Sequence, residues 1–147
     1  MQLSINPSEI NQFITDIHKK FEDNGNMRRF YSGVAKILLN EQIRNMDSEG
    51  SSIGKRWSPL APSTVDNRSR KGKWPGKMLQ VSGELKTRNV TAFDDTKAEV
   101  NNNTPYAKFL FFGTKNMPAR PWLGLNDETE NRIITLYSKL LNEFLNK

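Results

Sequence analysis

Cysteine is absent from the chain, and histidine occurs only once, at position 18. Without cysteine there is no disulfide framework, no zinc–thiolate site and no thiol nucleophile. His18 lies at the edge of an apolar helical stripe, so we expect a partly exposed helix residue rather than a metal ligand or a triad member. No run approaches 18 apolar residues, and "MQLSINPSEI" lacks the basic and then apolar pattern of a signal peptide. We therefore expect a soluble protein with no membrane partner.

Motifs that mark common catalytic sites are also missing. The sequence contains no glycine-rich phosphate loop, no GxSxG elbow and no HExxH pair. Asp94, Asp95 and Lys97 can be read as the acid-x-lysine half of a metal-dependent nuclease motif, but "DDT" is also a common turn composition. We therefore predict a protein that is not an enzyme and needs no cofactor or metal.

Positive charge is concentrated in one segment. The 147-residue chain carries a net charge of +6, and residues 55–77 hold seven basic residues against the single acid Asp66, which accounts for the whole excess. The charge therefore acts locally rather than as a general affinity for anions. With 35% hydrophobic residues, including eight Phe and three Trp, the chain is able to bury the core of one domain. The seven basic residues are Lys55, Arg56, Arg68, Arg70, Lys71, Lys73 and Lys77.

Two amphipathic helices are predicted at the start of the chain. In "NPSE", Asn6 has the position of a helix cap, and apolar residues then follow the helical period up to Phe21. The glycine of "DNGN" ends this helix. A second helix is predicted from about residue 27 to 46, and the short turn between them predicts an antiparallel pair.

We expect a single α+β domain over residues 1–147. Its predicted parts are a helical pair (1–47), a long basic loop (48–84), an antiparallel sheet (85–125) and a C-terminal helix (126–147). The strand-like segments are "LKTRNVTAF", "KAEVNN" and "YAKFLFF", with "RPWL" as a candidate fourth edge. Asp127 and Glu130 have the spacing of a capping box for the last helix. A small sheet of three to four strands should therefore pack with two N-terminal helices and one C-terminal helix.

The run "FLFF" is apolar at all four positions. A strand with one wet face should alternate between apolar and polar residues, so this segment predicts a strand that is covered on both faces. Either the helices of the domain or another subunit can supply the second cover. Three helices are few for both faces, which favours a subunit interface.

Four blocks, "GKRWSPLAPST", "KMLQVSGEL", "TPYAKFLFFGT" and "MPARPWLGL", occur in this order between Gly54 and Asn126, over about half the chain. Together they resemble the phage virion morphogenesis family, the tail-completion proteins of Mu-like and related tailed bacteriophages. Phe111 and Phe112 depart from the family pattern, which often has a polar or charged residue before the glycine of the third block. The partner surface is therefore expected to be more apolar than usual.

The resemblance implies a non-enzymatic structural protein that acts late in virion assembly, at the head-proximal end of the tail or in the neck. It implies a homo-oligomeric ring around the DNA channel, with six subunits expected from tail symmetry. The implied partners are tail-tube or tail-terminator proteins and neck or head-completion proteins, with the virion tail or neck as the location and the host cytoplasm during assembly. The predicted interface residues are Trp57, Leu60, Tyr106, Phe109, Phe111, Phe112, Arg120, Trp122 and Leu123.

The block "MPARPWLGL" is predicted to be a stiff connector. Pro118 and Pro121 fix φ and lower the entropy lost on ordering, so the segment delivers Trp122 and Leu123 to a defined place. That place is either the core of the domain or an interface. Arg120, between the two prolines, is suited to a bidentate pair with a carboxylate of its own subunit or of a neighbour.

The basic segment 55–77 leaves a second hypothesis open, a small nucleic-acid-binding module. Its basic residues, with Trp57 and Trp74, have the composition to hold phosphates and stack on bases. In the tail-completion hypothesis, Trp57 and Leu60 instead anchor the loop on the body, and its outer part is mobile until it orders on an acidic neighbouring subunit. A protein partner is favoured over DNA in the channel, because the segment has few stacking residues and no predicted helix to enter a groove.

Overall fold

The structure is a computed structural model that describes residues 7–147, so the predicted cap Asn6 lies outside the described residues. The described residues form six α-helices, one 3-10 helix and one antiparallel sheet of two strands. In chain order these are α1 (Pro7–Asp23), α2 (Asn26–Asp47), η1 (Ser51–Ile53), α3 (Pro62–Arg70), α4 (Glu84–Thr87), β1 (Asn89–Phe93), β2 (Ala98–Asn102), α5 (Ala107–Phe112) and α6 (Asp127–Leu145). The predicted mixture of helix and sheet is confirmed, whereas the number of strands and the arrangement of the helices differ.

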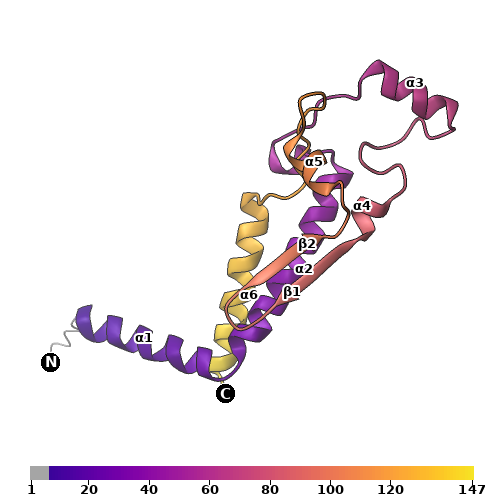
Figure 1. Cartoon of the computed structure of the whole chain (residues 1–147). Helices are drawn as coiled ribbons and strands as arrows, with labels where there is room; N and C mark the ends of the chain where they lie inside the picture. The colour runs from indigo at the N-terminus through magenta and orange to yellow at the C-terminus, as the bar shows by residue number, and fades with distance from the viewer. Residues whose placement is uncertain (1–6) are drawn as a thin grey trace.

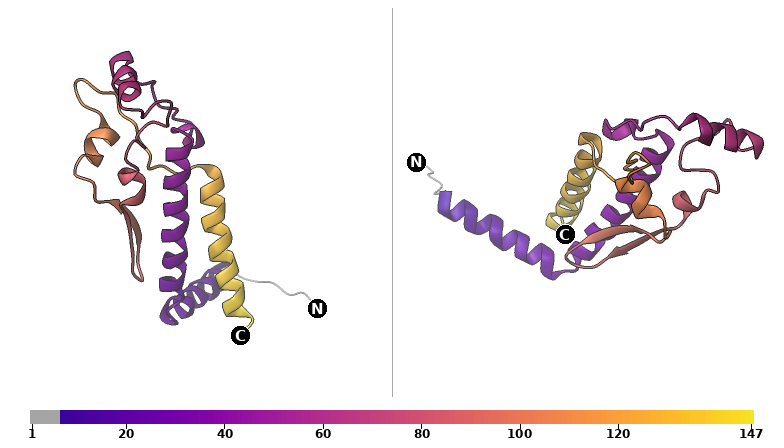
Figure 2. Two further views of the ribbon diagram at one scale, coloured as in Figure 1. Left: turned by 90° about the vertical axis from the view of Figure 1, so that its right-hand side faces the viewer. Right: turned by 45° about the horizontal axis from the view of Figure 1, so that its top comes forward.

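The central unit is a long antiparallel pair made of α2 and α6 (Figure 1). Figure 2 shows α2 between α6 on one side and the β1–β2 hairpin on the other. Gly33 allows close contact in this pair, because a Cβ atom there would come within 2.5 Å of a Leu136 methyl group. Val34 and Ala35 of α2 and Leu140 of α6 are buried.

The predicted antiparallel pairing of α1 with α2 is wrong. α1 leaves the lower end of α2 at an angle, and its N-terminal part points away from the body (Figure 1). Gly25, in the left-handed conformation (φ 70°), makes the turn. Phe21 then inserts between Tyr137 and Phe144 of α6, with ring centroids 5.5 and 5.7 Å apart. The last turns of α1 therefore place aromatic side chains on α6, whereas the long antiparallel partner of α2 is α6.

The sheet has two strands instead of three or four. Its register pairs Asn89 with Asn102 and Phe93 with Ala98. The turn between the strands is closed by Asp94, whose Oδ1 accepts hydrogen bonds from the Thr96 and Lys97 amides. The Thr96 hydroxyl donates to the same oxygen at 2.7 Å, and this bond, followed by those of the amides, lowers the pKa of Asp94. The carboxylate therefore has the role of a turn residue.

The predicted strand "YAKFLFF" is the short helix α5. Ala107, Leu110 and Phe111 recur at helical spacing and face the core, while Phe109 and Phe112 face outward and are 50% and 77% exposed. An apolar run therefore does not require two covered faces here, since its outer residues remain in solvent. The "RPWL" segment likewise has no strand assignment and belongs to an extended connector, residues 113–126.

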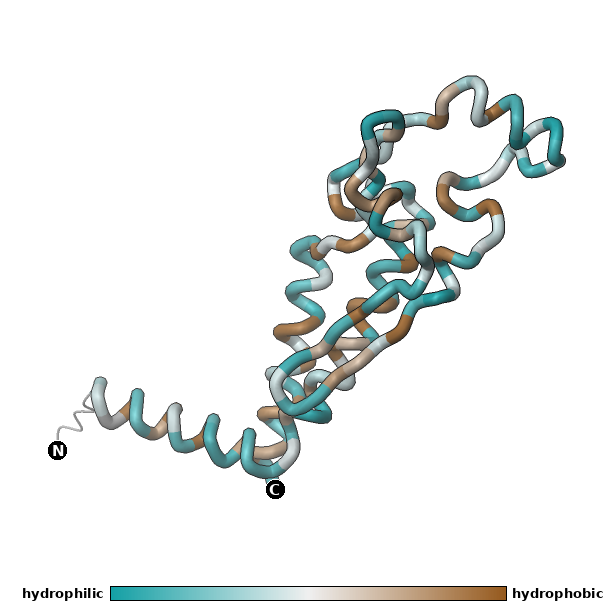
Figure 3. Tube along the Cα trace, viewed as in Figure 1, coloured by the Kyte–Doolittle hydropathy of each residue, from teal (hydrophilic) through white to brown (hydrophobic). Residues whose placement is uncertain are grey.

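Residues 48–84 contain η1, α3 and the start of α4, so the prediction of a loop without elements is wrong in part. Pro62 begins α3 in the first turn of a helix, where its missing N–H is not needed. α3 is largely exposed and extends from the body on an excursion of the chain that we call the basic arm, residues 55–77 (Figure 1). In Figure 3 the outer end of this arm is hydrophilic, and apolar residues gather where the arm joins the body.

Candidate interaction surfaces

The sequence blocks that carry the family resemblance pack against one another at the upper end of α2. The buried cluster consists of Met46, Trp57, Met78, Leu85, Ala107 and Trp122, with Leu60, Leu79, Leu110 and Phe111 packed against it. Each of the four blocks contributes at least one of these residues. Their shared pattern therefore encodes a structural junction between the basic arm, α4, α5 and the connector.

Trp57 ties the basic arm to the connector. Its side chain is 4% exposed, and its indole Nε1 donates a 2.8 Å hydrogen bond to the Pro121 carbonyl. Gly50 lies directly beside the indole, at a position where a Cβ atom would come within 2.7 Å of the ring. The predicted anchoring of the arm by Trp57 and Leu60 is confirmed, and the indole of Trp57 is held by its own chain.

Arg120 makes a second tie between the same two segments. Its Nη2 donates to the carbonyls of Ser58 and Pro59, at 3.2 and 3.3 Å, and the side chain is 4% exposed. Burial of the guanidinium and the nearby charge of Arg68 lower the pKa of Arg120, which Glu49 partly offsets. Within residues 7–147, the expected pairing of Arg120 with a carboxylate is not found. Its guanidinium donates instead to the two backbone carbonyls of the arm.

Buried amides hold the connector from the other side. Asn45 of α2 is fully buried and donates to the carbonyls of Trp122 and Gly124 at 3.0 and 3.3 Å. Asn126, rather than the predicted Asp127, caps α6, because its extended backbone lets its side chain accept from the Thr129 amide. The carbonyls of Trp122 and Gly124, like that of Pro121, thus find side-chain donors in the core.

These amides were not found from the sequence. Glu41, Gln42 and Asn45 are buried and lie on one side of α2. The sequence signal for their burial was their position on α2, because Glu41, Gln42 and Asn45 continue the apolar stripe of the helix toward Met46. That signal is weak, since the same letters are equally common on a solvated helix face.

The nine predicted interface residues divide into three groups by burial. Trp57, Arg120 and Trp122 are buried in the chain itself, with Trp122 packed edge-on against Phe111 at 5.3 Å between ring centroids. Leu60 and Phe111 are half-buried at the edge of the cluster. The exposed members are Tyr106, Phe109, Phe112 and Leu123, which are between 39% and 77% exposed. The accessible part of the predicted interface is thus the outer face of α5 with the middle of the connector.

Two shallow hollows continue this apolar surface. One, of about 220 Å³, includes Phe111, Phe112 and Trp122 in its lining, and the other, of about 200 Å³, includes Leu38 and Leu125. Both are lined by Val100 of β2 and Leu123 of the connector. We call the combined depression the connector groove.

The basic arm keeps its charge unpaired. Among the ion pairs formed by residues 7–147, none involves any of the seven basic residues of the arm. Arg68 and Lys77 make hydrogen bonds only to carbonyls, of Lys77 at 3.3 Å and of Asp47 at 2.6 Å respectively. The arm therefore presents a concentrated positive field to any anionic neighbour.

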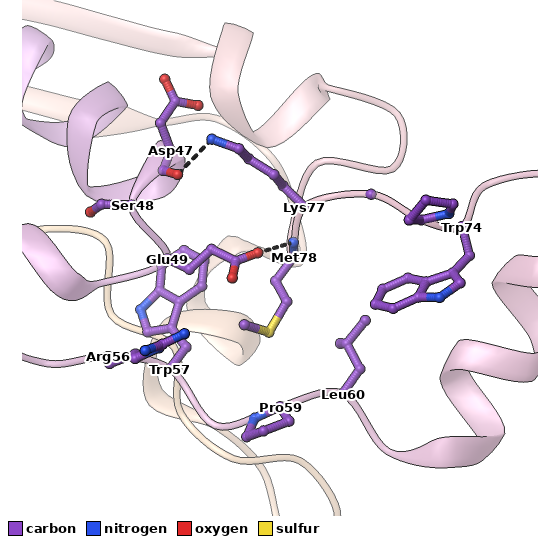
Figure 4. Close-up of a pocket in the computed structure, with 12 residues that line it drawn as sticks. Asp47, Ser48, Glu49, Arg56, Trp57, Pro59, Leu60, Trp74, Lys77 and Met78 are labelled. Carbon is purple, nitrogen blue, oxygen red and sulfur yellow. Dashed lines mark hydrogen bonds between the residues drawn. The ribbon is translucent and has the colours of Figure 1, made fainter.

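A larger hollow of about 660 Å³ lies between the arm and the C-terminal end of α2 (Figure 4). Trp57, Leu60 and Trp74 supply apolar walls, and Trp74 is 40% exposed. Across the hollow, Glu49 accepts a 2.8 Å hydrogen bond from the amide of Met78, the residue that directly follows the arm, and this bond holds the chain where it returns to the body. The arm therefore stands off the body over this hollow, while hydrogen bonds near both of its ends hold it to the body.

The described residues show neither a metal centre nor a membrane span. Across residues 7–147, no three or more His, Asp or Glu side chains are grouped to hold an ion, and no helix is both long and apolar enough to cross a bilayer. His18 is half-buried, and its Nδ1 lies 2.9 Å from the hydroxyl of Tyr137, whose pKa is raised by burial. The lone histidine thus contributes to packing between α1 and α6.

The chain is a small mixed helix-and-sheet protein whose motif residues build a junction flanked by exposed apolar and basic surfaces. It belongs to the phage virion morphogenesis family, which matches residues 5–142. It is 30% identical over 112 residues to the "Mu-like prophage FluMu G protein 1" of Haemophilus influenzae, an alignment that covers 75% of this chain and 76% of that protein. No solved structure matches the chain. The family resemblance inferred from four blocks is confirmed. The match extends beyond these blocks into the N-terminal helices and the C-terminal helix α6.

Proposed function

We propose that this protein is a non-enzymatic structural component of a tailed bacteriophage that completes the tail or neck and helps to join tail to head. In this role it forms a ring around the DNA channel, with six subunits by analogy with tail symmetry. We expect it in the host cytoplasm during assembly and then in the tail or neck of the virion. Membership of the phage virion morphogenesis family and the relative from a Mu-like prophage support a role in virion morphogenesis.

The observation that carries the ring is the exposed apolar surface beside the motif junction. Phe109, Phe112 and Leu123 are 50%, 77% and 43% exposed, on elements whose inner faces are firmly packed. Apolar residues that gather on a rigid part of the surface mark sites of protein association. The neighbours expected to cover them are further copies of this chain and the tail-tube, tail-terminator or neck proteins.

The basic arm supports a second contact in the same assembly. None of its seven basic residues forms an ion pair within the described chain, and only Lys77 lies near enough to a carboxylate, that of Asp47, to lower its pKa, so most of the charge of the arm remains available to an anionic neighbour. We assign this neighbour as an acidic surface of an adjoining subunit. DNA is the competing partner, and α3 adds a helix that the sequence did not predict.

Native mass spectrometry of the purified chain, alone and with isolated tail ends, tests the assignment. The expected result is a closed oligomer that persists at moderate salt. A chain that stays monomeric and also fails to bind tail ends overturns the ring. If instead the monomer binds duplex DNA with an affinity that falls by orders of magnitude over a fourfold rise in salt, the nucleic-acid-binding module is the correct function.

A further inference from the structure

Among the described side chains of α1, only those in its C-terminal half are buried or half-buried. Phe21 is fully buried against aromatic side chains of α6. Ile10, Phe13 and Ile14 continue the same apolar face, yet they are 43%, 65% and 48% exposed. Figure 1 shows this part of the helix extending away from the body. We call residues 7–17 the α1 tip.

The connector groove is the second uncovered apolar feature. Phe112, Leu123 and Leu125 are 77%, 43% and 47% exposed at its rim. Its two hollows, of about 220 and 200 Å³, are each smaller than the roughly 300–1,000 Å³ of sites for small molecules. Neighbouring hollows of this size are suited to single side chains that project from one face of a helix.

The tip and the groove do not meet within one subunit. Besides the burial of Phe21, the side chain of Asn26 donates a 3.0 Å hydrogen bond to the Phe21 carbonyl, which fixes the direction of α1. The tip then points away from α2, whereas the groove includes Leu38 and Gln42, about three to four turns along α2. Among residues 7–147, each surface is therefore left open to a partner from another molecule.

We propose that the α1 tip of one subunit docks in the connector groove of a second copy through Ile10, Phe13 and Ile14. These three positions have the i, i+3, i+4 spacing of side chains that anchor a helix in a groove. This inference rests on the ring of the proposed function, and it names the contact that builds the ring.

Charge favours this pairing of surfaces. The tip contains acidic residues, among them Asp16, and no basic residue. The only charged side chain among the described residues that line the groove is Lys108. An acidic helix beside a single positive charge is electrostatically complementary, and repulsion between two basic arms does not arise at this contact.

The geometry of the contact is head-to-tail. Because tip and groove are different surfaces, each subunit gives its tip to one neighbour and its groove to the other, which produces a ring when the rotation closes. In an isologous dimer the same patch of each subunit meets itself. A dimer through the tips would leave the grooves exposed, and a dimer through the grooves would leave the tips exposed.

Disulfide trapping tests the contact directly, because the chain has no cysteine of its own. Full-length Phe13→Cys and Leu123→Cys proteins are mixed, oxidised and separated on a non-reducing gel. The expected product is a disulfide-linked heterodimer, formed roughly 100-fold faster than with the control Gln12→Cys, on the opposite face of the same turn. The double variant Phe13→Cys/Leu123→Cys should give a ladder of multimers. Equal rates for the two tip positions, or a dominant bond between two Phe13→Cys chains, would overturn the proposal.

A second pair of variants separates this contact from the ring itself. Phe13→Asp should weaken self-association by about 30-fold, as for a hot-spot residue, while its unfolding midpoint and that of Gln12→Asp stay at the parent value. A Phe13→Asp ring that is as stable as the parent ring overturns tip docking and leaves the proposed function standing. A parent chain that never assembles overturns both. A monomeric double-cysteine variant with an internal disulfide would show that the tip folds back onto its own subunit.

Discussion

Replacing Trp57 by phenylalanine tests whether the shared motif blocks form a structural junction. The indole is 4% exposed and donates a 2.8 Å hydrogen bond to the Pro121 carbonyl. Loss of that bond leaves a half-buried carbonyl unpaired, at about 1–2 kcal/mol. The smaller ring also leaves a cavity in the cluster, which adds about 1 kcal/mol when scaled from the roughly 3–5 kcal/mol of complete Trp truncation. We therefore expect the free energy of unfolding to fall by ~2–3 kcal/mol.

Trp74→Phe is the matched control for this experiment. The same substitution in the same arm removes a side chain that is 40% exposed, so its effect should stay within about 0.5 kcal/mol. Urea unfolding followed by far-UV circular dichroism gives both values without relying on tryptophan fluorescence. If Trp57→Phe changes the unfolding free energy by no more than the control does, the arm is not tied to the connector through this indole.

Three further outcomes follow from the same contacts. Arg120→Ala should lower the unfolding free energy by ~3 kcal/mol, from two charge-assisted hydrogen bonds that Nη2 donates, and Arg120→Lys by about half of that, since the lysine ammonium cannot occupy the position of Nη2; urea titration of both variants checks this. The pKa of Asp47 is lowered chiefly by its hydrogen bond to Lys86, so its stabilisation is present above its unfolded pKa and lost as the pH falls through the folded value. Asp47→Asn should therefore be less stable than the parent at pH 7, by at most about 1 kcal/mol for so exposed a pair, and the difference should shrink as the pH falls below the unfolded pKa and through the lower folded value, as measured by urea unfolding at a series of pH values. Trypsin should cut quickly within residues 68–73 of the free subunit, where α3 is short and exposed, and slowly in the assembly; equal rates on a time-course gel would mean that no partner covers the arm.

Helix prediction succeeded where period and length agreed. α1, α2 and α6 are 17, 22 and 19 residues long, and their apolar stripes repeat over several turns. Their mutual arrangement was not predictable in the same way. A short turn after α1 favours an antiparallel neighbour in general, but here the left-handed Gly25 and the fit of Phe21 between aromatic rings of α6 set another direction.

Short apolar segments were the least predictable part. In a segment as short as α5, four consecutive apolar residues are compatible with a strand or with a helix. The packing of Phe111 on Trp122 and of Leu110 on the buried cluster decides the outcome. α3 has no apolar period at all, and its helix depends on Pro62 and on local hydrogen bonds. The predicted interface residues all lie in the family blocks, and the structure divided them into a buried junction and an exposed surface. The basic residues of the arm were identified from the local excess of positive charge.

The most direct test of the account is a complementation experiment with particles made from a phage genome that lacks this gene. We predict that such a lysate contains separate filled heads and tails in electron micrographs, and that adding the purified parent protein restores joined particles. Phe13→Asp protein should fail to restore them, whereas Gln12→Asp protein should succeed. Normal joined particles in the lysate without any added protein would contradict the central claim.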